Sequence, residues 1–313
     1  MADKAAIGIV GAGLMGHGIA QVFAVAGHPV RVYDPVPQAL ATLRRRVEAN
    51  LVDLGRDPAA AALITPCDTL AAAVATADFV FEAALEKVDL KQAIFADLER
   101  LAPREALLAS NTSVIPIGKI AARVTTRDRV LGTHWWTPPY LVPLVEVIET
   151  EGTSPESVTA MMKLLESVGK TPVHVRKDVP GFIGNRLQHA LWREAIALVQ
   201  AGVCDAPTID KVVKASFGRR LAVIGPLESA DMVGTDLALD CHVNLLADLD
   251  RTPGPLPYLE KLVADGRLGF KTGEGFRRWT PAEQADLRAR LMNHLKKMAA
   301  ELDAPDKTDK GNR

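Results

Sequence analysis

Glu146 is a carboxylate in the middle of the apolar run 144–148, which has the pattern of a buried β-strand. A lone buried carboxylate is costly, so it must be paired or protonated. The nearest partner in the sequence is His134, at the carboxyl end of the preceding predicted strand, where open α/β sheets bind ligands. A histidine held by a carboxylate can act as a general base, because the acid fixes its tautomer and stabilises the imidazolium. The same spacing fits a structural His–Glu pair in the core, and both interpretations stay open here.

A glycine-rich segment follows the first predicted strand and opens the first predicted helix. Its three glycines form a G-x-G-x-x-G pattern: Gly11, Gly13 and Gly16. The first permits a tight turn, the second lets a pyrophosphate approach the backbone, and the third lets helix and strand pack closely. Asp34 ends the second predicted strand, about 20 residues further on, where a carboxylate can accept hydrogen bonds from ribose hydroxyls. That carboxylate would repel a 2′-phosphate, and residues 35–37 contain no arginine, so the pattern predicts NAD rather than NADP.

The composition excludes several function classes. The 313 residues have room for two domains, at about 100–200 residues per domain. With a net charge of −1 and no long basic block, a large nucleic-acid surface is not expected. No apolar run is long enough to span a membrane. The three cysteines are widely spaced and form no ligand cluster, which predicts no metal site, no disulfide framework and a cytoplasmic location.

The first 180 residues alternate short apolar runs with longer helical patterns. The expected strands are 5–10, 30–33, 78–81, 106–109, 130–133, 144–148 and 172–176, and the expected helices are 14–26, 35–53, 87–101 and 154–168. Strands that are apolar on both faces belong in a sheet covered by helices on both sides. This rhythm predicts an α/β fold with a Rossmann-type, doubly wound parallel sheet over residues 1–181.

The remaining residues, 182–313, have amphipathic patterns and no convincing strand. Helices are expected at 182–202, 207–216, 235–249, 256–265 and 280–302. The second domain is therefore predicted to be all-helical, to close a substrate site against the first domain and to pair two subunits through its apolar faces.

Four sequence blocks have the order and spacing typical of the L-3-hydroxyacyl-CoA dehydrogenase family, which the chain resembles over nearly its whole length. The blocks are 11–16, 110–113, 132–138 and 180–186, and residues 270–276 add a C-terminal signature. The resemblance implies an NAD-dependent dehydrogenase that acts on a CH–OH group of a small molecule, of the kind used in fatty acid metabolism.

The resemblance also implies roles for individual residues. His134 would take the proton of the substrate hydroxyl while hydride leaves its carbon for the nicotinamide, and Glu146 would orient His134. Ser113 and Asn185 would hydrogen-bond the substrate oxygen. Without the resemblance, Ser113 would be interpreted as a helix N-cap and Asn185 as a turn residue.

Further cofactor contacts are predicted near the glycine segment and the strand ends. Leu14 and Met15 lie inside the glycine block, and Asn111 lies in the second block. Glu86 follows the predicted strand 78–81 and would help to shape the nicotinamide site, although a solvated helix start explains it equally well.

Several departures from the family pattern bear on the substrate. Trp135, Trp136 and Thr137 replace the family's paired phenylalanines and asparagine, which predicts an enlarged apolar pocket wall beside His134. An alanine-rich segment, 57–62, replaces the lysine-rich helical hairpin that grips coenzyme A in classical members.

Few basic residues remain as candidate phosphate contacts. They are Arg44, Arg45, Arg46 and Arg56, and a solvated helix face explains the triplet as well. Arg219 and Arg220 lie in a segment similar to the carnitine dehydrogenase and lambda-crystallin branch, where they would face a substrate carboxylate or simply the solvent. These departures favour a small free 3-hydroxy acid over a short 3-hydroxyacyl-CoA; a cyclic imine is a further conceivable hydride acceptor.

Two rival functions remain. One is a β-hydroxyacid dehydrogenase that uses a catalytic lysine, although no comparable lysine stands out near Asn185. The other is a non-catalytic, crystallin-like nucleotide-binding protein, against which the intact set of His134, Glu146, Ser113 and Asn185 argues.

Overall fold

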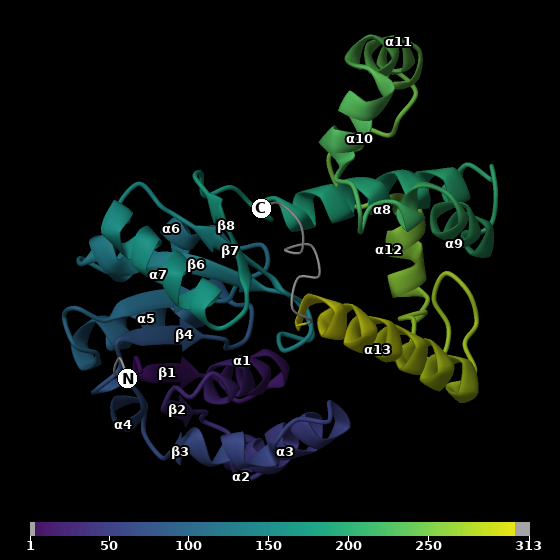
Figure 1. Cartoon of the computed structure of the whole chain (residues 1–313). Helices are drawn as coiled ribbons and strands as arrows, with labels where there is room; N and C mark the ends of the chain where they lie inside the picture. Colours follow the sequence, from purple (N-terminus) through teal and green to yellow (C-terminus); the bar gives the residue numbers. More distant parts are fainter. Residues whose placement is uncertain (1–3, 304–313) are drawn as a thin grey trace, which may run out of the picture. The chain divides into compact units, whose positions relative to one another are not determined.

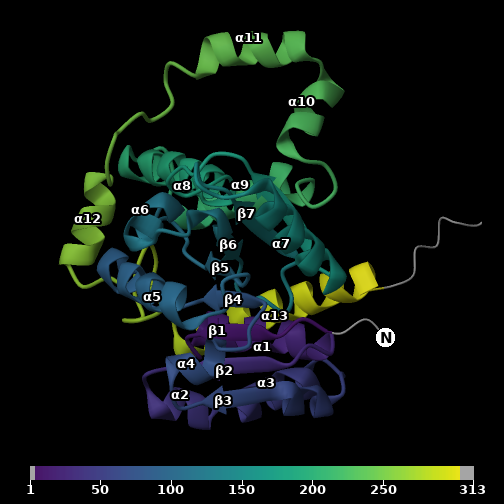
Figure 2. The same ribbon diagram turned by 90° about the vertical axis from the view of Figure 1, so that its left-hand side faces the viewer.

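One sheet contains all the strands of the computed structural model, which describes residues 4–303. Its strands are β1 (Ile7–Val10), β2 (Val30–Tyr33), β3 (Ile64–Cys67), β4 (Phe79–Glu82), β5 (Leu107–Ser110), β6 (Val130–Trp135), β7 (Leu144–Ile148) and β8 (Thr171–Val175). They lie in the order β3-β2-β1-β4-β5-β6-β7-β8, and Figure 2 shows β3 to β7 in this order. The first six run parallel, whereas β7 is antiparallel to β6 and β8 is parallel to β7.

Helices cover both faces of this sheet (Figure 1). They are α1 (Leu14–Val25), α2 (Pro37–Ala41), α3 (Leu43–Asp53), α4 (Leu70–Val74), α5 (Val88–Leu101), α6 (Ile117–Ile120) and α7 (Pro155–Ser167), with 3-10 turns η1 (Pro58–Leu63), η2 (Ala121–Arg123) and η3 (Arg127–Arg129). Apolar residues of α1, α3 and α7 form one core cluster, and those of α4, α5 and α6 form the other. The predicted doubly wound sheet is confirmed.

Strand β3 was not expected from the sequence. It lies at the edge of the sheet, and only Ile64 and Cys67, its two ends, are buried. Pro66 cannot donate a ladder hydrogen bond, which an edge strand tolerates. Neither an alternating nor a continuous apolar pattern is therefore present to indicate a strand.

The later part of the chain is helical, as predicted. Its elements are α8 (Gly184–Gln200), α9 (Ala206–Ala215), η4 (Phe217–Arg219), α10 (Pro226–Val233), α11 (Thr235–Leu245), α12 (Pro257–Ala264) and α13 (Pro281–Asp303). In this part of the described chain, β-pairing is limited to the isolated bridges of Glu274 with Gly269 and with Arg278. No helix within residues 4–303 combines the length and apolar character that crossing a membrane requires.

Contacts divide the described chain into two compact units. Unit 1 comprises residues 4–186 and 292–303, and unit 2 comprises residues 187–291. Residues 183–185 form hydrogen bonds to Glu146 and Ser113 within unit 1. The ends of the two predicted domains, residues 1–3 and 304–313, lie outside the described residues.

Glu99 of α5 ties that helix to the segment between η2 and η3. Its Oε1 accepts hydrogen bonds from the backbone N–H and hydroxyl of Thr125 and from the N–H of Thr126, at 2.7–2.9 Å. Burial raises the pKa of Glu99, but these bonds outweigh it and lower the pKa from 4.5 to about 2.

A pKa that is depressed on folding contributes stability above the unfolded value, and this contribution is lost as pH falls. We expect Glu99→Gln to lower the free energy of unfolding by ~1–2 kcal/mol at pH 7. The deficit should shrink as pH falls from 4.5 towards 2, as urea denaturation across a pH series would measure. Glu48→Gln, at an exposed position on α3, is the control. A deficit that stays constant with pH would contradict this assignment.

Candidate active site

His134 and Glu146 face each other directly across two strands. They are register partners in the antiparallel pair of β6 and β7. Nδ1 of His134 lies 2.7 Å from Oε2 of Glu146, and the two residues are only 4% and 1% exposed. His134 and Glu146 thus form a buried hydrogen-bonded pair, because the antiparallel pairing of β6 and β7 places the two residues opposite each other.

The second oxygen of Glu146 is held by the backbone. Its Oε1 accepts hydrogen bonds from the N–H groups of Ile183 (2.8 Å) and Gly184 (3.0 Å). The preceding residue, Phe182, is buried and has a φ of 50°, a conformation that costs energy for a side chain of this size. This turn aims both N–H groups at the carboxylate.

The pKa of Glu146 is the result of two opposed effects. Burial raises the pKa, but the hydrogen bonds from His134, Gly184 and Ile183 favour the charged form and lower it overall. An ionised carboxylate can only accept, so the neutral imidazole carries its proton on Nδ1. Nε2 of His134 is then the ring nitrogen that can take a proton from a substrate.

Two aromatic rings line His134. The ring of Trp136 lies 5.3 Å from the imidazole and that of Phe182 lies 5.6 Å away, both measured between centroids. A Cβ at Gly184 would come within 2.6 Å of Cζ2 of Trp136, so glycine is needed there for the indole to sit beside the pair. The structure therefore places the ring of Trp136 beside His134.

Trp135 and Thr137 lie elsewhere. Because successive side chains of a strand point to opposite faces, Trp135 enters the core, where its ring packs edge-on against Phe23 and Phe81. Thr137 is exposed, and its hydroxyl lies 3.1 Å from the sulfur of Met15 in the glycine segment. The structure does not bring Trp135 to His134, and it puts Thr137 beside the predicted cofactor loop.

Ser113 and Asn185 are brought together from distant parts of unit 1. Nδ2 of Asn185, in the first turn of α8, donates to the carbonyl oxygen of Ser113 (2.8 Å). Asn185 is 9% exposed, while Ser113 is exposed in the loop after β5. An amide has two N–H donors, so one remains for another acceptor. Asn185 follows directly on Gly184, so these residues adjoin the His134–Glu146 pair.

Glu86 is the acceptor for the loop that carries Ser113. Its Oε1 accepts from the N–H of Ser113 (2.8 Å), the N–H of Val114 (3.2 Å) and the hydroxyl of Thr112 (2.5 Å). Burial raises the pKa of Glu86, but these bonds and the nearby ammonium of Lys91 lower it overall. Glu86 thus fixes the loop and is more than a solvated helix start.

Lys91 is a residue that sequence reasoning missed. It is fully buried, and its ammonium lies 2.7 Å from Oε1 of Glu82 and 3.6 Å from Oε2 of Glu86. Glu82 also accepts from the hydroxyl of Ser110 (2.6 Å). One signal was available: Lys91 lies on the same face of α5 as the buried Phe95 and Leu98, where a lysine needs a partner.

The glycine segment has the shape that a dinucleotide requires. Gly11 has a φ of 103°, and a Cβ there would lie 2.7 Å from the carbonyl oxygen of Ala83. A Cβ at Gly16 would lie 1.8 Å from the carbonyl oxygen of Gly11, whereas a Cβ at Gly13 would meet nothing within 4 Å. The first and third glycines are therefore needed for packing, and the second leaves open space at the N-terminus of α1, where phosphates bind.

Of the other predicted cofactor residues, Asp34 contacts this segment, Leu14 lies within it and Asn111 follows β5. Oδ2 of Asp34 accepts from the N–H of Ala12 (2.7 Å), and Oδ1 accepts from the N–H of Val36 (2.8 Å). Leu14 is exposed, and Oδ1 of Asn111 accepts from the N–H of Trp135 (3.0 Å). The open space at Gly13, with a carboxylate beside it, fits NAD, and within residues 4–303 no group of three or more His, Cys, Asp or Glu could hold a metal ion.

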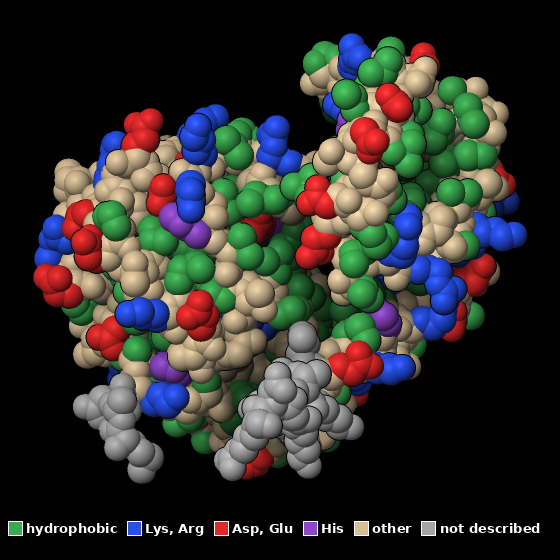
Figure 3. Space-filling view, turned by 45° about the horizontal axis from the view of Figure 1, so that its top comes forward, with side chains coloured by type: hydrophobic (Ala, Val, Ile, Leu, Met, Phe, Trp, Pro, Cys, Tyr) green, Lys and Arg blue, Asp and Glu red, His purple; other side chains and the backbone are tan. Residues whose placement is uncertain are grey.

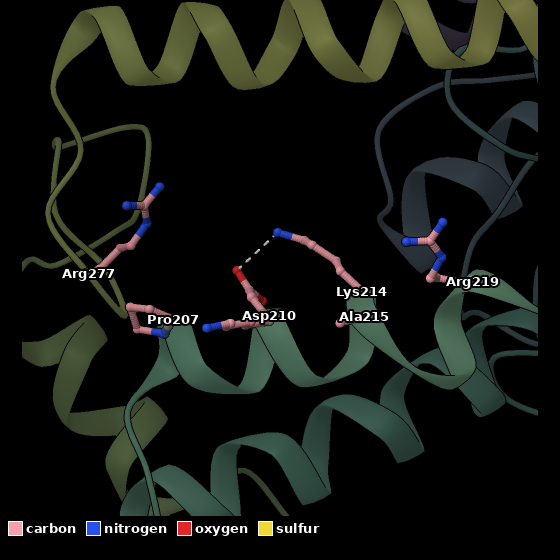
Figure 4. A pocket seen from close by; sticks show the side chains of 7 residues that line it. Pro207, Asp210, Lys214, Ala215, Arg219 and Arg277 are labelled. Atoms are coloured by element: carbon pink, nitrogen blue, oxygen red, sulfur yellow. Dashed lines mark ion pairs between the residues drawn. The ribbon is translucent and has the colours of Figure 1, made fainter.

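Arg219 and Arg220 line different cavities of unit 2. Arg219 faces a cavity of about 440 Å³ (Figure 4), whose further lining residues are Pro207, Asp210, Lys211, Lys214, Ala215 and Arg277. Arg220 lines a smaller one of about 190 Å³ with mainly apolar neighbours. In the first cavity Lys214 pairs with Asp210 at 3.7 Å, and the positive side chains outnumber the single acid.

Two family models match consecutive parts of the chain. The NAD binding domain of 3-hydroxyacyl-CoA dehydrogenase matches residues 6–179, and the C-terminal domain of 3-hydroxyacyl-CoA dehydrogenase matches residues 181–279.

Curated relatives match over most of their length. The chain is 35% identical to 5-formyl-3-hydroxy-2-methylpyridine 4-carboxylate 5-dehydrogenase of Mesorhizobium japonicum, over 92% of this chain and 95% of that protein. It is 39% identical to a probable 3-hydroxybutyryl-CoA dehydrogenase of Bacillus subtilis, over 86% and 95%. The crystal structure of a 5-formyl-3-hydroxy-2-methylpyridine 4-carboxylic acid 5-dehydrogenase, an NAD+-dependent dismutase, has a TM-score of 0.89 at 34% identity and covers 97% of this chain and 100% of that one.

The different surroundings of the glycines give a test of the cofactor site. We expect Gly13→Ala to leave the thermal midpoint of the free protein nearly unchanged but to weaken NAD binding at least about tenfold, ~1.4 kcal/mol, because the added methyl group occupies the open space. Gly16→Ala should instead destabilise the free protein, because its Cβ collides with the backbone. Calorimetric titration and thermal denaturation measure the two effects, and unaltered NAD affinity of Gly13→Ala would refute the assignment.

Proposed function

This chain belongs to the 3-hydroxyacyl-CoA dehydrogenase family and is an NAD-dependent oxidoreductase, and on that premise we propose that it oxidises a secondary alcohol with His134 as the general base. The observation that carries the proposal is the 2.7 Å contact between Nδ1 of His134 and Oε2 of Glu146. NAD, when bound, supplies the acceptor for the hydride that leaves the alcohol carbon.

Residues of the chain accept the hydroxyl proton and stabilise the charge that develops on the substrate oxygen. Nε2 of His134 takes the hydroxyl proton, and the ionised Glu146 stabilises the imidazolium that results. The free N–H of Asn185 and the hydroxyl of Ser113 are proposed to donate to the substrate oxygen, which favours the polarised C–O bond in both directions of the reaction. Trp136 and Phe182 form apolar walls that keep water away from the imidazole.

Replacing the base tests this proposal directly. We expect His134→Ala to lower kcat by about 10²–10⁴-fold, the usual contribution of a general base, while NAD affinity measured by titration stays within about twofold. Glu146→Gln should lower kcat as well, because an uncharged amide stabilises the imidazolium less. His174→Ala is a matched control, since His174 pairs with Glu149 at 2.7 Å outside this site.

The outcome also separates the rival functions. Turnover that survives His134→Ala would favour a lysine-dependent β-hydroxyacid dehydrogenase. Tight NAD binding without turnover of any substrate offered would favour a non-catalytic, crystallin-like role.

The substrate is proposed to be a small free 3-hydroxy acid rather than a coenzyme A thioester. Support comes from the connection between α3 and β3, residues 54–63, which contains no lysine and folds only into the alanine-rich turn η1. The carboxylate of Asp57 caps this turn through the N–H of Ala59. Such a short connection offers little surface to a coenzyme A nucleotide. The relative of 35% identity, named for a pyridine carboxylate, is consistent with a free acid.

A matched pair of substrates tests this choice. We expect kcat/KM for 3-hydroxybutyrate to exceed that for 3-hydroxybutyryl-CoA by at least about tenfold, followed as NADH absorbance, because the short, lysine-free connection 54–63 offers little to offset the cost of ordering the coenzyme A chain. The reverse preference would identify a short 3-hydroxyacyl-CoA as the substrate and would leave the role of His134 unaffected.

We also propose that unit 2 pairs two copies of the chain. Helices α10 and α11 bury none of their residues, and hydrophobic side chains gather on their surface (Figure 3), with Leu227 79% and Val243 72% exposed. Apolar surface of this kind is usually covered by a partner. A reducing, cytoplasmic setting is proposed from the three free cysteines.

A further inference from the structure

The three consecutive arginines of α3 have three different environments. Nε of Arg44 donates to the carbonyl oxygen of Ile64 (2.5 Å), and Arg45 is exposed. Arg46 turns inward, where its Nη2 donates to the carbonyl oxygens of Ala12 (2.6 Å) and Ala39 (3.0 Å). The triplet is therefore not one solvated face, and its third member reaches the cofactor loop.

Arg46 and Asp34 hold the same residue of that loop from two sides. Ala12 lies between the first two glycines of the motif. Its N–H donates to Oδ2 of Asp34 (2.7 Å), and its carbonyl oxygen accepts a hydrogen bond from Arg46. Burial lowers the pKa of Arg46, and the negative charge of Asp34 acts in the opposite direction. The position of Ala12 thus depends on an acid and a base from different elements.

Some N–H groups of the Arg46 guanidinium have no hydrogen-bond acceptor within residues 4–303. Of its five N–H groups, only those on Nη2 have acceptors among the residues that the structure describes. Nε is buried, so the two N–H groups on Nη1 are the ones that a ligand can reach. A guanidinium with free N–H groups binds phosphate oxygens strongly. The ribose of the cofactor belongs beside Asp34, so a phosphate on its 2′ oxygen would lie near both charges.

We propose that Arg46 forms a latent binding site for the 2′-phosphate of NADP and that the Asp34 carboxylate keeps this site closed. With Asp34 present, the phosphate is repelled and Arg46 only positions the loop for NAD. Without that charge, Arg46 is already in place to pair with the phosphate. The proposal rests on NAD binding and is independent of the substrate and of the role of His134.

The test is a double-variant cycle read out by binding. The Kd of NADP and of NAD is measured by calorimetric titration for the wild type, Asp34→Ser, Arg46→Gln and the double variant. We expect Asp34→Ser to bind NADP at least about tenfold more tightly than the wild type, and the double variant to lose that gain. Arg46→Gln alone should weaken NAD binding about threefold to tenfold.

Two outcomes would overturn the proposal. Either Asp34→Ser binds NADP no better than the wild type, or the double variant keeps the gain, in which case Arg46 does not contact the phosphate. Arg45→Gln, on the exposed side of the same helix, controls for general loss of positive charge and should leave both affinities unchanged.

A further variant separates binding from folding. Thermal denaturation of each free protein reports whether the loop still folds. If Arg46→Gln proves too unstable to titrate, Arg46→Lys replaces it in the cycle: it keeps a positive charge without the planar fork, so it should retain only part of the NADP gain. A full gain with lysine would show that charge alone suffices and would refute a specific guanidinium site.

Discussion

The buried carboxylate of Glu146 is the constraint on which the rest of the site depends. Both of its oxygens need hydrogen bonds, since an unpaired charge in the core would cost several kcal/mol. One oxygen accepts a hydrogen bond from the imidazole of His134, and the other accepts hydrogen bonds from the N–H groups of Ile183 and Gly184. The backbone turn at Phe182, with its positive φ, is stabilised by that second set of bonds. Glu146 therefore orients the imidazole of His134 and also positions the start of α8.

A chain of hydrogen bonds connects this pair to the cofactor side of the sheet. Asn185 follows Gly184 and bonds to Ser113, whose N–H is held by Glu86. Glu86 approaches Lys91, which is paired with Glu82 in the core. Glu146, Glu86, Glu82 and Lys91 all have hydrogen-bond or ion-pair partners, so these side chains are held in place without a ligand. His134, Glu146, Asn185 and Ser113 are thus connected through the protein to Glu86 and the buried Lys91.

Much of the fold could be predicted because its cause is local. Short apolar runs with helical segments between them specify a sheet covered on both faces, and the spacing of Gly11, Gly13 and Gly16 between a strand and a helix indicates the cofactor loop. The edge strand β3 could not be predicted because only its ends are buried. Trp135, predicted to line the pocket, enters the core because the alternation of β6 puts its side chain on the face opposite His134. Lys91 was missed because a single lysine on an apolar helix face reveals its partner only in three dimensions.

The sequence by itself determined the family motifs, the cofactor loop, the sheet and the pairing of His134 with a carboxylate, because these depend on residue types and on spacing along the chain. Only the tertiary structure decided which neighbours share a face and which distant groups meet. It turned Trp136 towards His134 and Trp135 into the core, and it brought Arg46 to the carbonyl of Ala12. The physical reason is that burial and hydrogen-bond satisfaction are settled by packing between elements, which spacing along one chain does not specify.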